Sequence, residues 1–216
     1  MENRSITRTR SSFMGKTLCL MGVGLLITFI VGTWMSQYIT NLPGPVFLGA
    51  MILELVMVVT LVKRVAKMST STAIFWFLVY SAVNGVTLSI IFTTVPQFQL
   101  ITVFALTSLM FFSSGMIGLT TKKDLSVIGQ FAMMFVIGLI ILMVMQMFIV
   151  SATFNLGISL LGITIFCGLT AYDMQKIKLM QAQSNDMHGV VLAALSLYLD
   201  FVNLFLFVLR LFNGKN

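Results

Sequence analysis

The chain of 216 residues is 58% hydrophobic and only 9% charged, whereas soluble domains carry about 25% charged residues. This composition excludes a soluble globular protein and predicts an integral membrane protein. The net charge of +7 comes from basic residues scattered between apolar stretches, so it reflects membrane topology and argues against nucleic acid as a partner. No Pro-, Gly- or Ser-rich linker divides the sequence, and we expect residues 1–216 to form a single domain.

Apolar stretches of membrane-spanning length recur along the chain. A hydrocarbon core of about 30 Å requires about 20 apolar residues in a helix. The stretches predict an all-α fold with seven transmembrane helices, at residues 17–37, 46–62, 72–94, 98–119, 126–149, 155–175 and 189–212. Residues 1–16 precede the first of them as a basic tail. Pro43, Pro45 and Pro96 lie in the breaks between stretches, where helices are expected to end.

Lysine and arginine occur in alternate connections between the predicted helices. The tail 1–16 is basic, and so are the connections at 63–67, 122–123 and 176–178, whereas the intervening ones carry no basic residue. Short cytoplasmic loops are enriched in Lys and Arg, so the N-terminus and the basic tail are predicted to be cytoplasmic. Seven spans place the C-terminus outside, but a re-entrant last helix would return it to the cytoplasm.

Three of the six carboxylates of the chain lie inside apolar stretches, namely Glu54, Asp173 and Asp200. A charged side chain at the bilayer centre costs about 2.5–3.5 kcal/mol on insertion scales. Such residues persist mainly where they face a polar path or one another. The chemistry of this protein is therefore predicted to depend on these buried carboxylates.

Polar residues form a stripe along the last apolar stretch, 189–212. Asp200, Asn203 and Arg210 follow Ser196 by four, seven and fourteen residues, which places them on one side of a helix. Because the rest of this helix is apolar, its polar side is expected to face protein or water, and the helix to be interior. Ser196 and Asn203 are interpreted as polar support for Asp200. A purely structural interhelical hydrogen bond is the alternative interpretation of Asp200.

Asp173 and Asp200 are predicted to meet across a helical hairpin. If residues 181–188 form its turn, the two carboxylates lie about 10 and 16 Å from that turn. At these depths they can come into contact, and two carboxylates in contact titrate as a pair. The alternative for Asp173 is a solvated helix end that pairs with Lys176 or Lys178.

Glu54 lies near the middle of the stretch 46–62, and Lys63 and Arg64 follow at its cytoplasmic end. A long basic side chain at this height can bend toward Asp173, although anchoring at the membrane interface is the other interpretation. His188, the single histidine of the chain, is interpreted as a solvated turn residue without a role.

Enzymatic motifs do not accompany these acids. The sequence contains no HExxH, no Gly-rich phosphate loop and no Gly-x-Ser-x-Gly. Two membrane aspartates formally match an intramembrane aspartyl protease, but Asp173 stands in Ala-Tyr-Asp-Met and no Gly-x-Gly-Asp is present. The last stretch has no mid-span lysine that could form a retinal Schiff base. We therefore expect no enzymatic activity and no cofactor.

Four segments resemble a known family. ILELVMVV, TKKDLSVIGQF, LTAYDMQKIK and ALSLYLDFVNLF are similar to segments of the transmembrane Bax inhibitor motif family, in particular of its short bacterial members. The resemblance covers the chain from its first apolar stretch to its last, and SLYLDFVNLF is its most specific part. It implies six helices that surround a central helix at 189–212, in a multi-pass protein of the bacterial inner (plasma) membrane.

The resemblance also implies a pH-sensitive calcium leak channel that is governed by a pair of aspartates. Matched residue by residue, the pH sensor and gate falls on Asp173 and Asp200, and an acidic position of the ion pathway falls on Glu54. A latch arginine falls on Arg64, and Lys63 is a second candidate because the spacing from Glu54 is shifted by one residue. Some bacterial relatives regulate a membrane quality-control protease, which implies a non-conducting modulator as the alternative function.

Calcium is expected as the transported ion. It prefers six to eight oxygen ligands when it is bound tightly, whereas Asp173 and Asp200 supply fewer. Such a weak, hydrated site suits permeation, because an ion must leave as well as enter. The expected partners are the lipid bilayer, calcium ions and, in the alternative function, a membrane protease. We expect a monomer.

Overall fold

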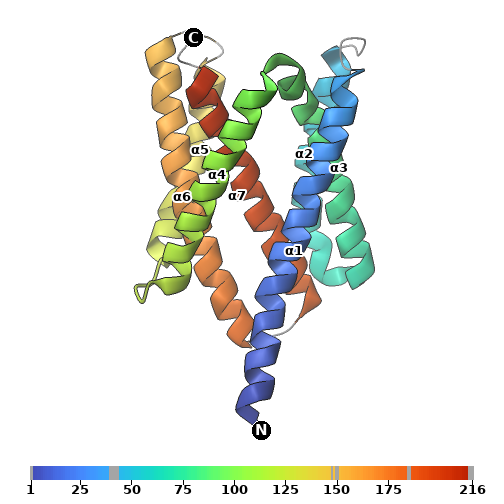
Figure 1. Ribbon diagram of the computed structural model, residues 1–216, viewed down its shortest axis with the longest axis vertical. Coiled ribbons are helices and arrows are strands. Elements are labelled where there is room, and N and C mark those ends of the chain that lie inside the picture. Colours follow the sequence, from blue (N-terminus) through green and yellow to red (C-terminus); the bar gives the residue numbers. More distant parts are fainter. Residues whose placement is uncertain (1, 39–43, 147, 149–150, 184–185, 214–216) are drawn as a thin grey trace. The chain divides into compact units, whose positions relative to one another are not determined.

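The computed structural model describes residues 2–38, 44–146, 148, 151–183 and 186–213. Within these ranges the chain forms seven α-helices and one short 3-10 helix (Figure 1). The helices are α1 (Glu2–Ser36), α2 (Gly44–Arg64), η2 (Val65–Lys67), α3 (Thr70–Thr94), α4 (Gln97–Thr120), α5 (Ser126–Gln146), α6 (Ala152–Gln183) and α7 (Met187–Asn213).

The prediction of an all-α, multi-pass membrane protein is confirmed. Six described helices are long and apolar enough to cross a membrane, namely α1, α3, α4, α5, α6 and α7. The remaining helix, α2, coincides with the predicted stretch 46–62. In α7, 72% of the most apolar window is buried, against 17–39% in the other five candidate spans. This difference agrees with the expectation that the last helix is interior.

Two helix boundaries differ from the sequence-based prediction. Residues 1–16 were expected to be a tail before the first helix, but α1 begins at Glu2 and continues to Ser36. The turn 181–188 was expected between the last two helices, but α6 continues to Gln183 and α7 begins at Met187. Once a helix has been nucleated, each further residue adds a hydrogen bond, so polar residues next to an apolar stretch extend the helix where no Pro stops it.

The chain packs as two compact units. Unit 1 comprises Met1–Gln97 and Met180–Tyr198, and unit 2 comprises Phe98–Leu179 and Leu199–Asn216. Unit 1 thus holds α1, α2, α3 and the first part of α7, whereas unit 2 holds α4, α5, most of α6 and the second part of α7. Because α7 is one continuous helix, it contributes its N-terminal residues to one unit and its C-terminal residues to the other.

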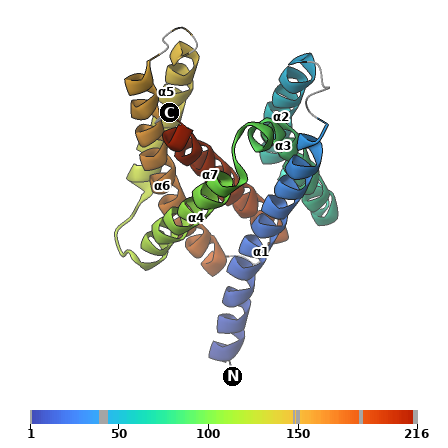
Figure 2. The same cartoon turned by 45° about the horizontal axis from the view of Figure 1, so that its top comes forward.

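In unit 1, small residues allow α1 and α3 to lie side by side (Figure 2). A Cβ atom added to Gly85 of α3 would lie 2.7 Å from the carbonyl oxygen of Thr28 and 3.2 Å from the backbone nitrogen of Gly32. On α1, a Cβ atom at Gly24 would lie 2.7 Å from the ring of Phe77. These glycines allow the two helix backbones to approach closely, as small residues do between membrane helices.

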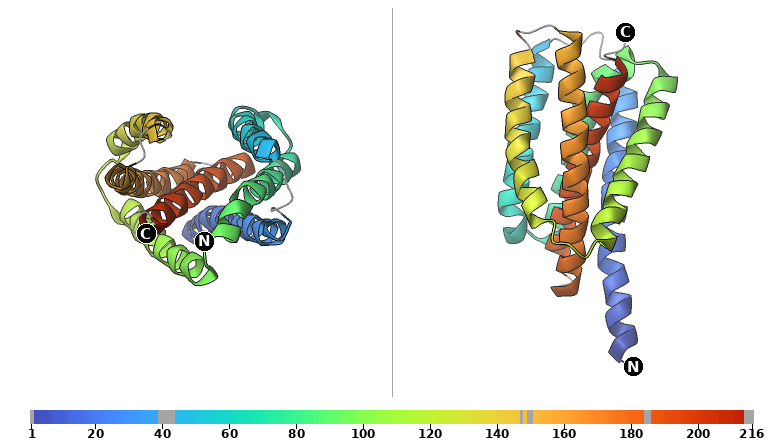
Figure 3. Two further views of the ribbon diagram at one scale, coloured as in Figure 1. Left: turned by 90° about the horizontal axis from the view of Figure 1, so that it is seen from above. Right: turned by 90° about the vertical axis from the view of Figure 1, so that its left-hand side faces the viewer.

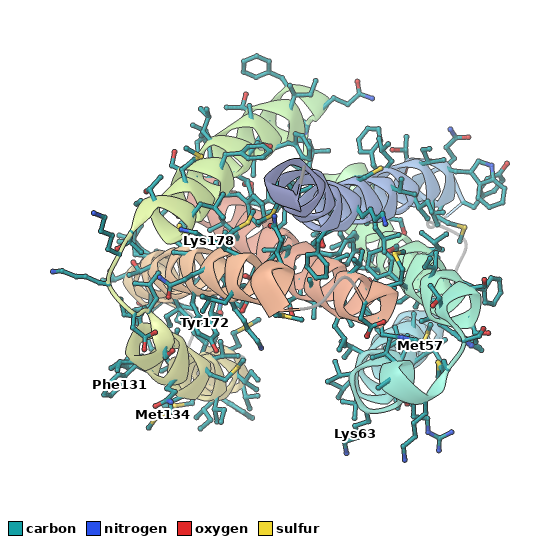
Figure 4. All side chains as sticks on the ribbon, turned by 90° about the horizontal axis from the view of Figure 1, so that it is seen from below. Met57, Lys63, Phe131, Met134, Tyr172 and Lys178 are labelled. Carbon is teal, nitrogen blue, oxygen red and sulfur yellow. The ribbon has the colours of Figure 1, made fainter. Side chains whose placement is uncertain are left out.

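In unit 2, α6 packs against both α4 and α7, and α5 runs beside α6 (Figure 3). A Cβ atom at Gly118 of α4 would lie 2.8 Å from the carbonyl carbon of Ala171 on α6. Phe131 and Met134 of α5 are 57% and 66% exposed, and they project outward from this unit (Figure 4). In a membrane protein such apolar side chains face lipid.

Candidate functional site

Asp200 is a buried carboxylate on α7. It is 5% exposed, and its atom Oδ2 is buried without a hydrogen-bond partner among the described residues. Its neighbours Phe201 and Val202 are buried too. An unpartnered buried polar atom costs about 1–3 kcal/mol, so this oxygen is expected to hold a proton or to meet a cation in the working protein.

Asp173 lies on α6, where it is half-buried, and it belongs to the same unit as Asp200. The rings of Phe166 on α6 and Phe207 on α7 stack with centroids 5.8 Å apart. Seven residues, about two helical turns, separate Phe166 from Asp173 along α6, and seven separate Asp200 from Phe207 along α7. Because the two helices run in opposite directions, the stacked rings and the aspartates lie at matching levels. The charge of Asp173 acts on Asp200, which agrees with the predicted pair, but contact between the two carboxylates stays a prediction.

Two carboxylates that meet in an apolar environment can share one proton, because two like charges cannot both be stable at low dielectric. When such a pair loses the proton, it can attract a cation. Among the described residues no group of three or more His, Cys, Asp or Glu side chains is placed to hold a metal ion. Asp173 and Asp200 alone therefore supply too few ligands to hold a metal ion tightly.

Lys176 and Lys178, the two lysines that follow Asp173 on α6, have different surroundings. The ammonium of Lys178 donates to the carbonyl oxygen of Leu119 at the end of α4, at 2.6 Å, and among the described residues no ion pair joins it to Asp173. Lys176 is exposed, but its charge acts on Asp173. The interpretation of Asp173 as the solvated partner of a lysine thus applies to Lys176 alone.

Gln175, a residue that sequence analysis overlooked, fastens the α4–α5 connection to α6. Its Oε1 accepts a hydrogen bond from the backbone N–H of Leu125 at 2.8 Å. Its Nε2 donates to the carbonyl oxygen of Lys123, also at 2.8 Å. Gln175 is two residues from Asp173, so this tie fixes α6 at the level of the aspartate. A glutamine at the end of the predicted stretch 155–175 gives no sequence signal for such a contact.

Asp124 in the same connection caps the start of α5. Its Oδ1 accepts from the hydroxyl of Ser126 at 2.6 Å and from the backbone N–H of Ser126 at 2.9 Å. The hydroxyl bond first, and the backbone bond second, lower the pKa of Asp124 below its ordinary value. A lowered pKa in the folded state stabilises the fold above the ordinary pKa of aspartate, and this contribution is lost as pH falls through the folded-state value.

We accordingly expect Asp124→Asn to lower the thermal unfolding temperature at neutral pH. The difference from the unchanged protein should shrink once the pH falls below about 4, where aspartate is protonated in the unfolded chain. Thermal unfolding of purified protein in detergent, measured at several pH values, checks this. A difference that persists unchanged at pH 3 would show that Asp124 acts through something other than its charge.

The polar stripe of α7 does not form one network. Asn203 donates to the carbonyl oxygen of Leu199 in its own helix, at 2.8 Å. Arg210 donates to Oε1 of Gln146 on α5 at 2.9 Å, and its guanidinium lies 5.9 Å from the centre of the Phe207 ring. Ser196 is half-buried in unit 1. The support of Asp200 by Ser196 and Asn203 therefore stays a prediction.

Glu54, the third membrane acid, is held in unit 1 by hydrogen bonds. Asn84 of α3 donates through Nδ2 to Oε1 of Glu54, and the hydroxyl of Thr87 donates to Oε2 at 3.2 Å. The phenol of Tyr198 on α7 donates to Oδ1 of Asn84 at 2.9 Å. Tyr198 also bonds to the hydroxyl of Thr28 on α1 at 2.6 Å. One chain of hydrogen bonds thus joins four helices around Glu54.

These hydrogen bonds are not predicted from the sequence, although Asn84 gives a signal. Asn84 is the single amide side chain in α3, a helix without charged residues. Thr28 and Tyr198 gave no such signal, because threonine and tyrosine are common in apolar helices.

Lys63 and Arg64, the two latch candidates, are exposed at the end of α2, and Lys63 projects outward from its helix (Figure 4). They belong to unit 1, whereas Asp173 belongs to unit 2. A latch to Asp173 therefore stays a prediction.

His188 was wrongly interpreted as a solvated turn residue. It lies in the first turn of α7 with its side chain 26% exposed. Its Nδ1 lies 3.0 Å from Oδ1 of Asp186, and its Nε2 lies 2.8 Å from the carbonyl oxygen of Met68. The imidazole thus ties the start of α7 to the connection between α2 and α3.

Comparisons with known proteins agree with this architecture. The family model described as inhibitor of apoptosis-promoting Bax1 matches residues 10–216. A protein of Escherichia coli K12 named inner membrane protein YbhL is 35% identical, over 94% of this chain and 92% of its own. A protein of Borreliella burgdorferi is 37% identical over 93% and 91% of the two chains, and a membrane protein of Streptococcus pyogenes serotype M1 is 34% identical over 95% and 93%. This chain belongs to the Bax inhibitor family of membrane proteins.

Proposed function

We propose that this protein is a pH-sensitive calcium leak channel of the bacterial inner membrane, in which Asp173 and Asp200 form the gate. The observation that carries this proposal is Oδ2 of Asp200, which is buried and has no hydrogen-bond partner among the described residues. Intramembrane acids mark ion or proton pathways by default. The membership in the Bax inhibitor family is compatible with this function, and we expect no catalysis.

The charge of the pair sets the state of the gate. With one proton, Asp173 and Asp200 share it, and α6 and α7 stay together. When that proton is lost, like-charge repulsion favours either separation of the helices or entry of a cation. Calcium enters as the transported ion and leaves readily, because two carboxylates bind it weakly. Glu54 provides a further acidic position on the pathway, and Arg64 or Lys63 is the candidate latch of the closed state.

Calcium flux into proteoliposomes tests the proposal. Purified protein is reconstituted into vesicles that hold a calcium indicator, and the signal is followed after calcium is added outside. We expect the protein alone to admit calcium at a rate that depends on pH. Flux equal to that of empty vesicles at every pH would contradict the channel proposal. The alternative function, a non-conducting modulator of a membrane protease, would then take its place. Co-purification of such a protease would then be the observation to seek.

The proposed orientation, with a cytoplasmic N-terminus, predicts which connections are outside. In a variant that lacks both native cysteines, single cysteines at Asn41, Pro96 and Ser151 should react with an impermeant maleimide added to intact cells. Asn41 lies outside the described residues. A cysteine at Lys122 is the matched control and should react only after the membrane has been opened. Labelling of Asn41, Pro96 or Ser151 from the cytoplasmic side alone would contradict the orientation.

A further inference from the structure

Glu54 makes the hydrogen bonds by which α2 contacts α3. Most described large apolar side chains of α2 are exposed, among them Leu53 at 49% and Leu55 at 66%, whereas Met57 and Leu61 are buried. The described hydrogen bonds between the side chains of α2 and another helix all involve Glu54, which bonds to Asn84 and Thr87 of α3. The position of α2 against α3 therefore depends in part on one ionisable group.

Ionised Glu54 fixes the direction of the hydrogen bonds around it. A carboxylate accepts only, so Asn84 must turn its Nδ2 toward Glu54 and its Oδ1 toward Tyr198. The single phenol proton of Tyr198 is then donated to Oδ1 of Asn84, at 2.9 Å. The oxygen of Tyr198 can accept the proton of Thr28, at 2.6 Å. With this direction, each hydrogen bond from Thr28 through Tyr198 and Asn84 to Glu54 has one donor and one acceptor.

Neutral Glu54 can be satisfied as well. A proton on Oε2 can be donated to the hydroxyl oxygen of Thr87, which then donates to the carbonyl oxygen of Asn84 at 2.8 Å. A proton on Oε1 instead requires the amide of Asn84 to turn over and accept it. Tyr198 then accepts from Asn84 and donates to Thr28, whose own proton is taken by the carbonyl oxygen of Ser81 at 2.8 Å.

Among the described residues, no basic side chain forms an ion pair with Glu54. The helix packed against it, α3, contains no Asp, Glu, Lys, Arg or His. The titratable groups that face Glu54 are the phenols of Tyr80 on α3 and Tyr198 on α7, and both are neutral at physiological pH. When Glu54 gains or loses a proton, the hydrogen bonds around it are therefore the interactions that must respond.

We infer that Glu54 is a second proton-binding site, separate from the aspartate pair, and that Asn84 and Tyr198 are its positioning residues. Asn84 stabilises the carboxylate by a charge-assisted hydrogen bond, and Tyr198 holds Asn84 in the orientation that this bond requires. Loss or gain of the proton changes the contacts between α2, α3 and α7. The inference rests on the proposed function and deepens it, since it assigns to the same channel a second proton-binding carboxyl that lies outside the gate.

Infrared spectroscopy of the purified protein without calcium tests the inference. The protonated carboxyl of Glu54 is identified as the C=O band that disappears in Glu54→Gln, and its intensity is followed across pH. Asn84→Leu should move the midpoint of this band upward by about one pH unit, a tenfold change in proton affinity, because a charge-assisted hydrogen bond favours the ionised form. Tyr198→Phe should move it in the same direction by a smaller amount.

Tyr80→Phe is the matched control, because its phenol donates no hydrogen bond to Asn84 in the described part of the chain. In Tyr80→Phe the Glu54 band should titrate with the same midpoint as in the unchanged protein. If Asn84→Leu does not fold, Tyr198→Phe decides alone, since it removes one oxygen atom. Midpoints that are equal in Tyr198→Phe and Tyr80→Phe, or a Glu54 band that does not vary with pH, would overturn the inference. Because no ion flux is measured, this result is independent of whether the protein conducts calcium.

Discussion

Substitution of Asp200 or Asp173 by asparagine is expected to flatten the pH dependence of calcium flux. Asparagine has nearly the same shape as aspartate but cannot titrate, so neither variant can share a proton between two carboxylates. A tenfold difference in proton affinity between the closed and open states corresponds to about 1.4 kcal/mol, which changes the ratio of open to closed channels by the same factor. The effect of Asp200→Asn should be at least as large as that of Asp173→Asn, because Asp200 is the more buried.

Flux in proteoliposomes, measured from about pH 5 to pH 8, checks this expectation. Lys122→Ala is the control, because Lys122 is exposed in the α4–α5 connection and should leave the profile unchanged. A steep, native-like profile in Asp200→Asn would show that Asp200 is not part of the sensor.

Gly118→Ala is expected to destabilise unit 2 strongly. The added Cβ would lie 2.8 Å from the carbonyl carbon of Ala171, so the backbones of α4 and α6 would have to separate. Overpacking of this kind costs typically about 1–3 kcal/mol, and a clash with backbone rather than with a flexible side chain places this case near the upper value. Ala171 is two residues from Asp173, so the same displacement should disturb the aspartate pair.

Gly138→Ala provides the matched control. Gly138 lies in α5 of the same unit, and a Cβ atom there would meet nothing within 4 Å. This substitution should be neutral or stabilise the helix by about 0.5–1 kcal/mol, because glycine is entropically costly in a helix. Thermal unfolding of the two variants in detergent compares them directly. Equal unfolding temperatures would show that the close approach at Gly118 is not required.

Much of the fold could be predicted from the sequence, because the apolar stretches and their breaks determine where helices can cross a bilayer. The errors lie at the polar ends of α1 and α6, where Arg8 and Gln181, for example, were expected to lie outside helices. A helix that has formed tends to extend until a helix-breaking residue occurs. Hydropathy marks the apolar stretch but not where the helix ends. The packing of the chain in two units likewise cannot be predicted from the number of apolar residues.

The acidic residues of the site could be found because a charge in an apolar stretch is conspicuous. Their similar depth could be estimated from helical rise, and the stacked rings of Phe166 and Phe207 place Asp173 and Asp200 at matching levels of α6 and α7. The surroundings of Glu54 could not be predicted. Neutral polar residues such as Tyr198 occur at many positions in membrane helices, and only packing decides which of them meet.

The most direct test of the central claim is the flux–pH profile of the double variant Asp173→Asn/Asp200→Asn beside that of the unchanged protein. Both are reconstituted at equal density into vesicles that hold a calcium indicator. We predict that flux through the unchanged protein varies about tenfold or more over the pH range in which the pair titrates. The double variant should show a nearly flat profile. A double variant whose flux still follows the native pH profile would contradict the account, and Glu54 would then be the next candidate for the sensor.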